Sequence, residues 1–502
     1  MTTSPSLPGS SPAPSPAHTQ AHSRRWLILG VICLAQLTVL IDNTVLNVAI
    51  PSLTRELDAA TADIQWMINA YSLVQSGLLL TAGSAADRYG RKKMLVAGLA
   101  LFGTGSLAAG FSQTTAQLIA ARAGMGVGGA LLFTTTLAVV MQVFEPEEQP
   151  RAIGIWAAVN SLGFAAGPLI GGLVLNHFWW GAIFLINLPV AALGLVAVIT
   201  LVPETKNPQG DRPDLLGAFL STVGMTSLVL AIISGPSHGW TSSRVLVGAV
   251  LAVLFLALFA YWESRIPYPM LDLAFFRDRR FTGAVAGAVL VTFGMGGALF
   301  LLTQHLQFVL GYGPLEAGLR TAPLALTVVA LNFTGLSAKV LARLGGPVSV
   351  LVGMVLVATG LASIATLASG GYAGTLLGLL LIGAGTAVAG PAMAHAIMSS
   401  IPPAKAGVGA GINGTLGEFG NGLGVAVLGA VLNARFAAVS LPAALAAANS
   451  ASEKARLIDS FSSGLETSLL LGASAVLLGG MVAATLLGRA NRKERQPALA
   501  TP

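Results

Sequence analysis

Fourteen long apolar runs, separated by short polar segments, constrain this chain more than any other feature. A helix needs about 20 apolar residues to cross a bilayer. Charged residues make up 9% of the chain, whereas soluble domains carry roughly 25%, so the chain needs lipid as its solvent. The sequence therefore predicts an all-α polytopic membrane protein. The runs lie near 26–50, 64–83, 94–111, 117–142, 152–175, 181–202, 214–234, 245–262, 281–310, 316–338, 347–368, 373–398, 407–432 and 466–488.

The basic residues are distributed unequally between the two sides of this predicted membrane protein. With the N-terminus in the cytoplasm, 20 of the 27 lysines and arginines lie in cytoplasmic segments, 5 lie outside and 2 lie within the runs. Cytoplasmic loops of membrane proteins are enriched in Lys and Arg. We therefore predict fourteen spans with both termini in the cytoplasm. Because the basic residues form no single patch, nucleic-acid binding is not expected.

A weak internal repeat predicts the organisation of the chain. The segment GSAADRYGRKK (83–93) follows the second run, and GLSAKVLARLGG (335–346) follows the tenth as a degenerate copy. Transporters often carry such repeats, with the substrate site between them. We expect an outer loop at 433–465, and the following regions: a disordered cytoplasmic tail at 1–23, a six-helix bundle at 24–203, a linker with two extra spans at 204–265, a second six-helix bundle at 266–488 and a cytoplasmic tail at 489–502.

The loop at 83–93 is the most specific motif in the chain. Five of its eleven residues are charged, and read alone it could be a basic loop that only sets orientation. It resembles the signature loop of the major facilitator superfamily. The resemblance implies the fold of that family, two six-helix bundles, here with two inserted helices. It also implies a gate lock between the bundles, formed by Gly83, Asp87, Arg88, Gly90 and Arg91.

Further segments resemble motifs of one branch, the fourteen-helix drug:proton antiporters, which includes multidrug and antibiotic exporters. These segments are 40–51 in the first run, 118–130 in the fourth and 180–189 in the sixth. The segment 154–172 resembles the antiporter signature of the fifth helix, which by resemblance points to export. Its small residues also predict a tight helix–helix contact. The residues that carry this motif are Gly163, Gly167, Pro168 and Gly171.

Three charged residues inside predicted spans carry the hypothesis of proton coupling: Asp42, Arg122 and Glu418. Charged groups at membrane depth are costly and indicate functional sites by default. We expect Asp42 and Glu418 to exchange protons, and Arg122 to pair with a carboxylate such as Asp42. Three alternatives stay open. Asp42 could be solvated near the outer surface, Arg122 could reach that surface, and Glu418 could be held by backbone groups or by Asn421.

Uncharged polar residues within the runs are candidates for a substrate cavity. Each could instead form a hydrogen bond between helices. The candidates are Asn47, Asn69, Asn160, Gln304, Gln307 and Asn413. No cofactor and no metal site are expected, because the single cysteine, Cys33, and the isolated His395 provide no cluster of ligands.

The sequence and the resemblance together predict a proton-coupled exporter of hydrophobic or cationic drugs and antibiotics that works by alternating access. We expect a monomer in a plasma membrane, by resemblance a bacterial inner membrane, with a small-molecule substrate, protons and the lipid bilayer as partners. The alternative is a dedicated exporter of one endogenous metabolite, such as an antibiotic made by the same cell. An enzyme is not expected, because no HExxH, GxSxG or P-loop pattern occurs.

Overall fold

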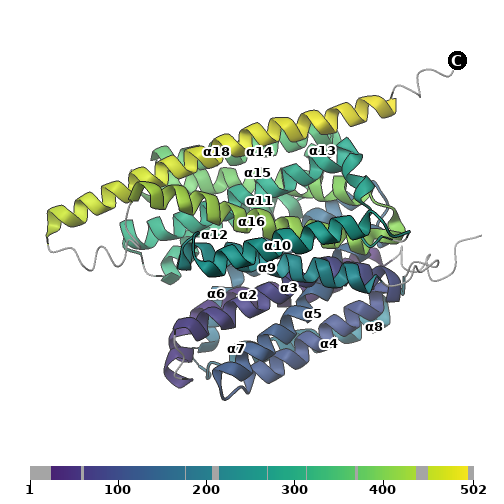
Figure 1. Cartoon of the computed structure of the whole chain (residues 1–502), viewed down its shortest axis with the longest axis horizontal. Coiled ribbons are helices and arrows are strands. Elements are labelled where there is room, and N and C mark those ends of the chain that lie inside the picture. The colour runs from purple at the N-terminus through teal and green to yellow at the C-terminus, as the bar shows by residue number, and fades with distance from the viewer. Residues whose placement is uncertain are drawn as a thin grey trace, which may run out of the picture.

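The computed structural model describes residues 24–57, 61–175, 177–205, 214–267, 269–312, 314–367, 371–436 and 450–495. In these residues the regular structure is entirely helical. The predicted tail at 1–23 lies outside the described residues, as do 496–502 and the stretch 437–449 of the predicted outer loop. The long helices run roughly along the long axis of the molecule (Figure 1).

The first group of helices, called here the N-terminal group, comprises α2 (Arg25–Glu56), α3 (Thr61–Tyr89), α4 (Arg91–Gly110), α5 (Thr115–Val143), α6 (Gln149–Leu175), α7 (Ala182–Leu185) and α8 (Asn187–Leu201). Two helices follow, α9 (Leu215–His238) and α10 (Ser243–Glu263). The C-terminal group comprises α11 (Arg279–Gln304), α12 (Pro314–Phe333), α13 (Leu336–Leu344), α14 (Gly346–Leu367), α15 (Tyr372–Ser399), α16 (Ala406–Phe436) and α18 (Ala451–Arg495), with the short segments η1 (Leu273–Arg277), η2 (His305–Val309) and η4 (Pro403–Lys405).

Eleven helices in the described part of the chain are long and apolar enough to cross a membrane. A twelfth span results if α12 and α13, bent by 65° where they meet, count as one. Gly335 lies at this bend with φ +70°, a conformation that glycine adopts at little cost. The helices α3 and α6 are 29 and 27 residues long but fall outside this set. The all-α membrane fold is confirmed, while the number of fourteen spans stays a prediction.

Each group of helices has its own hydrophobic core. The core of the N-terminal group includes Phe102, Trp156 and Phe184, and that of the C-terminal group includes Phe281 and Phe461. In Figure 1 the purple and blue helices lie below the green and yellow ones. The main helix pairs that join the groups are α3 with α16 and α6 with α12, and α5 also contacts α16 while α6 also contacts α15. The exact domain limits at 203 and 265 stay proposals.

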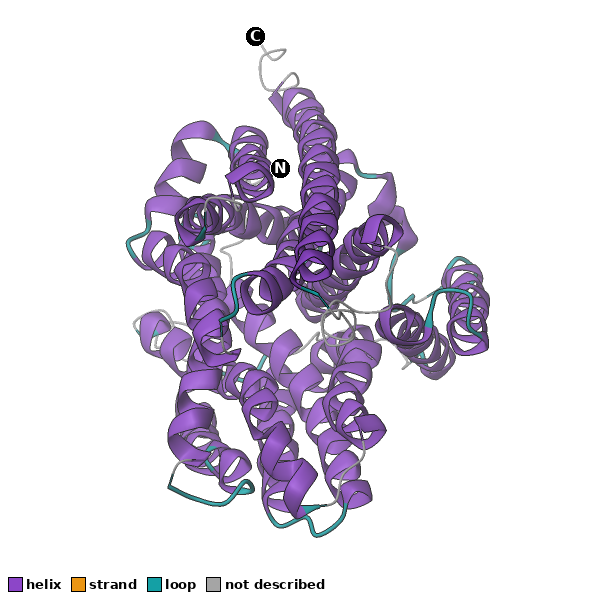
Figure 2. Ribbon diagram, turned by 90° about the vertical axis from the view of Figure 1, so that its left-hand side faces the viewer, coloured by secondary structure: helices purple, strands orange, loops and turns teal. Residues whose placement is uncertain are grey.

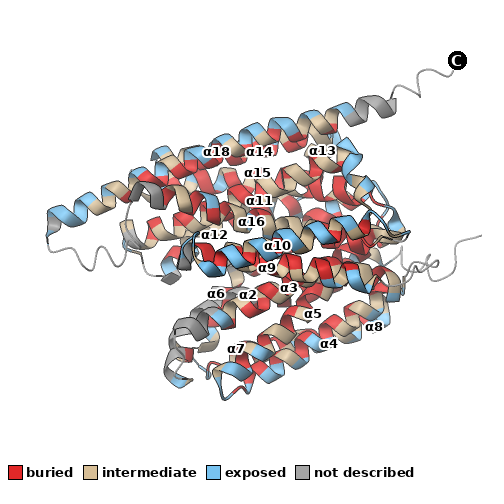
Figure 3. Cartoon of the chain, viewed as in Figure 1, coloured by how far each residue is buried: buried red, intermediate tan, exposed pale blue. Residues whose placement is uncertain are grey.

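The helices α9 and α10 pack against each other at one side of the molecule, beside the junction of the two groups (Figures 1 and 2). Of this pair, α9 contacts both α3 and α16. The outward face of α10 is exposed and apolar (Figure 3), with side chains such as Leu246, Val250 and Val253. A continuous apolar surface of this kind requires an apolar environment, which the lipid of a membrane provides.

Candidate functional site

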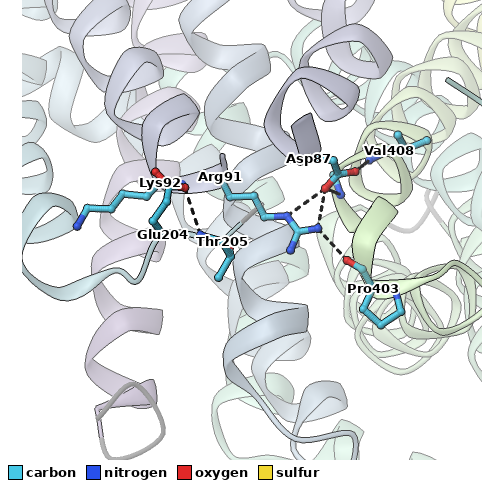
Figure 4. Close-up of polar contacts among 8 residues, drawn as sticks. Asp87, Arg91, Lys92, Glu204, Thr205, Pro403 and Val408 are labelled. Atoms are coloured by element: carbon cyan, nitrogen blue, oxygen red, sulfur yellow. Dashed lines mark hydrogen bonds and ion pairs between the residues drawn. The ribbon is translucent and has the colours of Figure 1, made fainter. Parts of the chain in front are cut away.

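The predicted gate loop joins the two groups of helices through Asp87 (Figure 4). Its Oδ1 atom accepts hydrogen bonds from the Gly407 N–H, at 2.8 Å, and from the Arg91 guanidinium, at 2.6 and 3.1 Å. Its Oδ2 atom accepts from the Val408 N–H at 3.0 Å. The Arg91 side chain in turn donates to the Pro403 carbonyl at 2.8 Å. Asp87 and Arg91, both buried, therefore connect the end of α3 to the start of α16.

Local geometry explains why these residues meet. The N–H groups of Gly407 and Val408 belong to the first turn of α16 and have no partner within that helix, and the positive end of the helix dipole favours a carboxylate there. Gly90 links α3 to α4 with φ +110°, which suits glycine. A side chain on Gly83 or on Gly407 would meet the backbone of the other. The two helices thus approach at backbone distance.

Arg88 takes a different position from its neighbours in the motif. Its Nε and Nη1 atoms are buried and have no hydrogen-bond partner among the described residues. Its guanidinium lies 5.6 Å from the ring centroid of Tyr89. The structure therefore brings Gly83, Asp87, Gly90 and Arg91 together with α16 or α4, but gives the Nε and Nη1 atoms of Arg88 no hydrogen bond to α16 among the described residues.

A second cluster of charged and polar groups is buried inside the N-terminal group. Asp42 of α2 forms an ion pair with Arg122 of α5, and each is 1% exposed. Arg122 also donates to the Met67 carbonyl at 3.1 Å and lies over the ring of Tyr71, with 4.6 Å to the centroid. This burial excludes a solvated aspartate and an arginine at the outer surface, the two alternatives left open by the sequence.

Sequence reasoning missed two members of this cluster. The Asn187 amide donates to Asp42 Oδ1 at 3.1 Å and to Ser106 Oγ at 3.2 Å. Asn187 begins α8 and is 2% exposed. The sequence did offer one signal for Asn187, its position inside the sixth-helix motif. An amide within a span can bond to many groups, however, so the sequence does not show which partner it takes. The cluster thus draws on five helices: α2, α3, α4, α5 and α8.

Glu418 lies on the face of α16 that is turned toward the N-terminal group. Three glycines of that face, at positions 407, 411 and 414, contact α3 or α5, the last two against Leu79 and Phe133. One turn further on, Glu418 is exposed although it is in mid-helix and surrounded by protein. Its carboxylate is therefore accessible in mid-helix, on the side of α16 where the two groups of helices meet. Among the described residues its carboxylate has no hydrogen-bond partner, and Asn421 is turned to Gly296 of α11 instead.

The predicted cavity residues are distributed over several helices. Asn69, Asn160, Gln304, Gln307 and Asn413 are all partly exposed. No hydrogen bond joins them to one another within the described part of the chain, and Asn160 Oδ1 is buried without a partner. Gln307 lies in the π-helical segment η2, a feature often found at functional sites. The side chain of Asn47 lies outside the described residues.

The predicted antiporter motif lies on α6, which packs against α2. A side chain on Gly163 would approach the Leu40 Cβ atom to 2.7 Å, two residues before Asp42. Gly167 and Gly171 are buried on the same helix, and the side chain of Pro168 lies outside the described residues. The motif therefore sets the spacing between α6 and the helix that carries the buried aspartate.

Comparison with known proteins identifies the family. The model of the Major Facilitator Superfamily matches residues 32–425. This chain belongs to the major facilitator superfamily. Among its relatives, the multidrug resistance protein Stp of Mycobacterium tuberculosis is 36% identical over 80% of this chain and 75% of its own length. The puromycin resistance protein pur8 of Streptomyces alboniger is 33% identical over 81% and 82%. These relatives confirm the predicted branch of drug exporters.

A solved structure of a major facilitator protein has the same fold. The crystal structure of the human organic anion transporter MFSD10 aligns with a TM-score of 0.63 at 16% identity, covering 93% of this chain and 100% of that one. At this identity the likeness concerns the fold alone. It agrees with an all-helical fold built from two groups of helices.

Proposed function

We propose that this major facilitator protein exports hydrophobic or cationic drugs and antibiotics across the plasma membrane in exchange for protons, as a monomer working by alternating access. The observation that carries the proposal is Glu418, an exposed carboxylate in mid-helix on the face of α16 turned toward the N-terminal group, with no hydrogen-bond partner among the described residues. An accessible carboxylate within a span attracts a cationic substrate, and a proton on it removes that attraction.

The buried pair of Asp42 and Arg122 offers a second place for the proton. In the ion pair the carboxylate offsets the charge of Arg122. A proton on Asp42 would remove that compensation from a buried guanidinium, which is unfavourable unless the surrounding helices rearrange. Substrate and proton then shift each other's affinity through one conformational equilibrium, as linkage requires.

The gate contacts support the direction of the cycle. Asp87 and Arg91 hold α3 and α16 together at the end predicted to be cytoplasmic. With that end in the cytoplasm, as we propose, this conformation would be closed on the inside, and Glu418 lies further along α16 than the Asp87 contacts. A proton from outside would reach Glu418 in this state, and the substrate would leave the same way.

The test is transport of a lipophilic cation into inside-out vesicles that contain the reconstituted protein, with and without an imposed pH gradient. We expect gradient-driven uptake by the wild type and its loss in Asp42→Asn and in Glu418→Gln. Glu316→Gln is the matched control, since Glu316 pairs with Arg320 on an exposed surface. Normal rates in both test variants, or wild-type transport that ignores the gradient, would contradict the proposal.

The second candidate is a dedicated exporter of a single metabolite. One relative of 33% identity is named for resistance to one antibiotic, puromycin. A panel of unrelated drugs, tested in a sensitive host, separates the two functions. A multidrug exporter lowers the susceptibility of the host to several chemical classes, whereas a dedicated exporter lowers it to one class only.

A further inference from the structure

Two carboxyl groups meet where the helix pair α9–α10 begins and ends. Asp214 precedes α9 and caps it, since its Oδ1 atom accepts from the Gly217 N–H at 2.8 Å. The indole N–H of Trp262 donates to the same atom at 2.9 Å. Glu263 is the last residue of α10 and is 3% exposed, and its Oε2 atom accepts from the Leu271 N–H at 3.2 Å. Each carboxyl group is thus fixed through one oxygen atom.

The other two oxygen atoms, Asp214 Oδ2 and Glu263 Oε1, are buried and accept no hydrogen bond from the described residues. Both lie beside Gly217: a side chain there would meet Asp214 Oδ2, and would lie 2.8 Å from Glu263 Oε1. Two buried acceptors therefore face the same small space without a donor. An unsatisfied buried acceptor costs roughly 1–3 kcal/mol, so this arrangement needs something to fill that space.

The charged groups of neighbouring elements do not supply the missing contact. Lys405 of η4 donates to the Pro269 carbonyl at 3.2 Å, and the Arg265 guanidinium lies 5.3 Å from the ring centroid of Tyr261. The segment 269–271 offers Glu263 only backbone N–H groups. No ion pair involves either carboxyl group among the described residues. Two adjacent buried carboxylates cannot both be charged at low cost, and one shared proton removes the repulsion and supplies the donor.

We propose that Asp214 and Glu263 form a proton-binding site, one proton between two carboxyl groups, separate from Asp42 and Glu418. The proton holds the start of α9, the end of α10 and the segment 269–271 together. That segment leads by short steps to the gate: Lys405 binds the Pro269 carbonyl, and Arg91 binds the Pro403 carbonyl in η4. The site therefore stabilises the surface against which the gate closes.

Infrared difference spectroscopy of the purified protein in lipid nanodiscs tests for the proton. In the wild type we expect the carbonyl-stretch band of a protonated carboxylic acid, lost as the pH rises. Asp214→Asn and Glu263→Gln should each remove this pH-sensitive band. Both variants keep the fold, because either amide donates to the remaining carboxylate, and asparagine caps a helix as well as aspartate does. Asp272→Asn is the matched control, since the half-buried Asp272 directly follows the segment 269–271 and caps η1.

Thermal unfolding gives an independent readout. If the folded protein holds a proton that the unfolded chain releases, stability falls as the pH rises, because the folded state then binds more protons. The wild type and Asp272→Asn should lose melting temperature across the range in which the band disappears, and Glu263→Gln should lose less. A band that survives in Glu263→Gln, or one absent from the wild type, would overturn the proposal. So would a cation-dependent rise in melting temperature at high pH that Glu263→Gln abolishes, since a metal ion would then fill the space.

Discussion

At the scale of single residues, the amide of Asn187 connects the buried carboxylate to its surroundings. Asn187→Ala removes the donor to Asp42 Oδ1 and to Ser106 Oγ. Loss of a buried hydrogen bond to a charged group costs about 1.5–3 kcal/mol. We expect proton-driven transport of a lipophilic cation in vesicles to fall roughly tenfold or more, with a lower melting temperature. Ser106→Ala, which leaves the bond to Asp42 intact, should have a smaller effect. Equal rates in wild type and Asn187→Ala would contradict this role.

The sequence predicted the charged members of this cluster and not the uncharged ones. A charged side chain inside a span needs a partner. Few other charged residues lie within the predicted spans, so Asp42 and Arg122 were each other's most obvious partners. Asn187 and Ser106 carry no such requirement, because amides and hydroxyl groups in a membrane find backbone or side-chain partners in many places. Which partner they take depends on how α4 and α8 pack around α2, and a single sequence does not contain that packing.

At the scale of helices, the contact between α3 and α16 depends on the absence of side chains at two glycines. In Gly407→Ala the new methyl group would lie 2.8 Å from Asp87 Oδ1 and against the Gly83 carbonyl. Overpacking of this kind costs about 1–3 kcal/mol, and we expect a lower melting temperature and slower export. The matched control is Gly30→Ala on α2, where open space surrounds the position and alanine favours the helix by up to about 1 kcal/mol. Similar melting temperatures for the two variants would exclude a tight contact here.

The hydropathy pattern predicted the positions of the helices more accurately than the residues at which they begin and end. The two described ends of the predicted outer loop, 433–465, are helical: α16 continues to Phe436, and α18 already begins at Ala451. The same helix continues to Arg495, beyond the predicted end of the last span at 488. The reason is that polar residues such as Glu453 and Lys454 end an apolar run but not a helix, whose backbone bonds are internal. The bend at Gly335 was not predicted either, because a glycine inside an apolar run is compatible with a straight helix.

At the scale of the whole molecule, the two groups of helices meet mainly through α3 with α16 on one side and α6 with α12 on the other. The α3–α16 contact is closed by ionic and capping interactions at Asp87. On the other side, a side chain on Gly154 of α6 would lie 2.9 Å from Asn332 Oδ1 of α12. The repeat at 335–346 has Lys339 where the first copy has Asp87. The first copy therefore has an acidic cap where the second has a lysine, and we expect control of the proposed gate to be asymmetric.

This asymmetry predicts that one substitution at Asp87 opens the closed side. Asp87→Asn removes the negative charge at the start of α16 and places an N–H group among donors, and the lost interaction of the charge with the helix N-terminus costs about 0.3–2 kcal/mol. In a Cys33→Ser background, a reporter cysteine at Ala410, which is fully buried on α16, should react with a membrane-impermeant thiol reagent roughly 2- to 30-fold faster, since 1.4 kcal/mol corresponds to a factor of ten. The control is Asp278→Asn, because Asp278 caps α11 at an exposed site without bridging the two groups. Equal labelling in the two variants would mean that α3 and α16 are held by packing alone, and that the charge of Asp87 has no part in closing the gate.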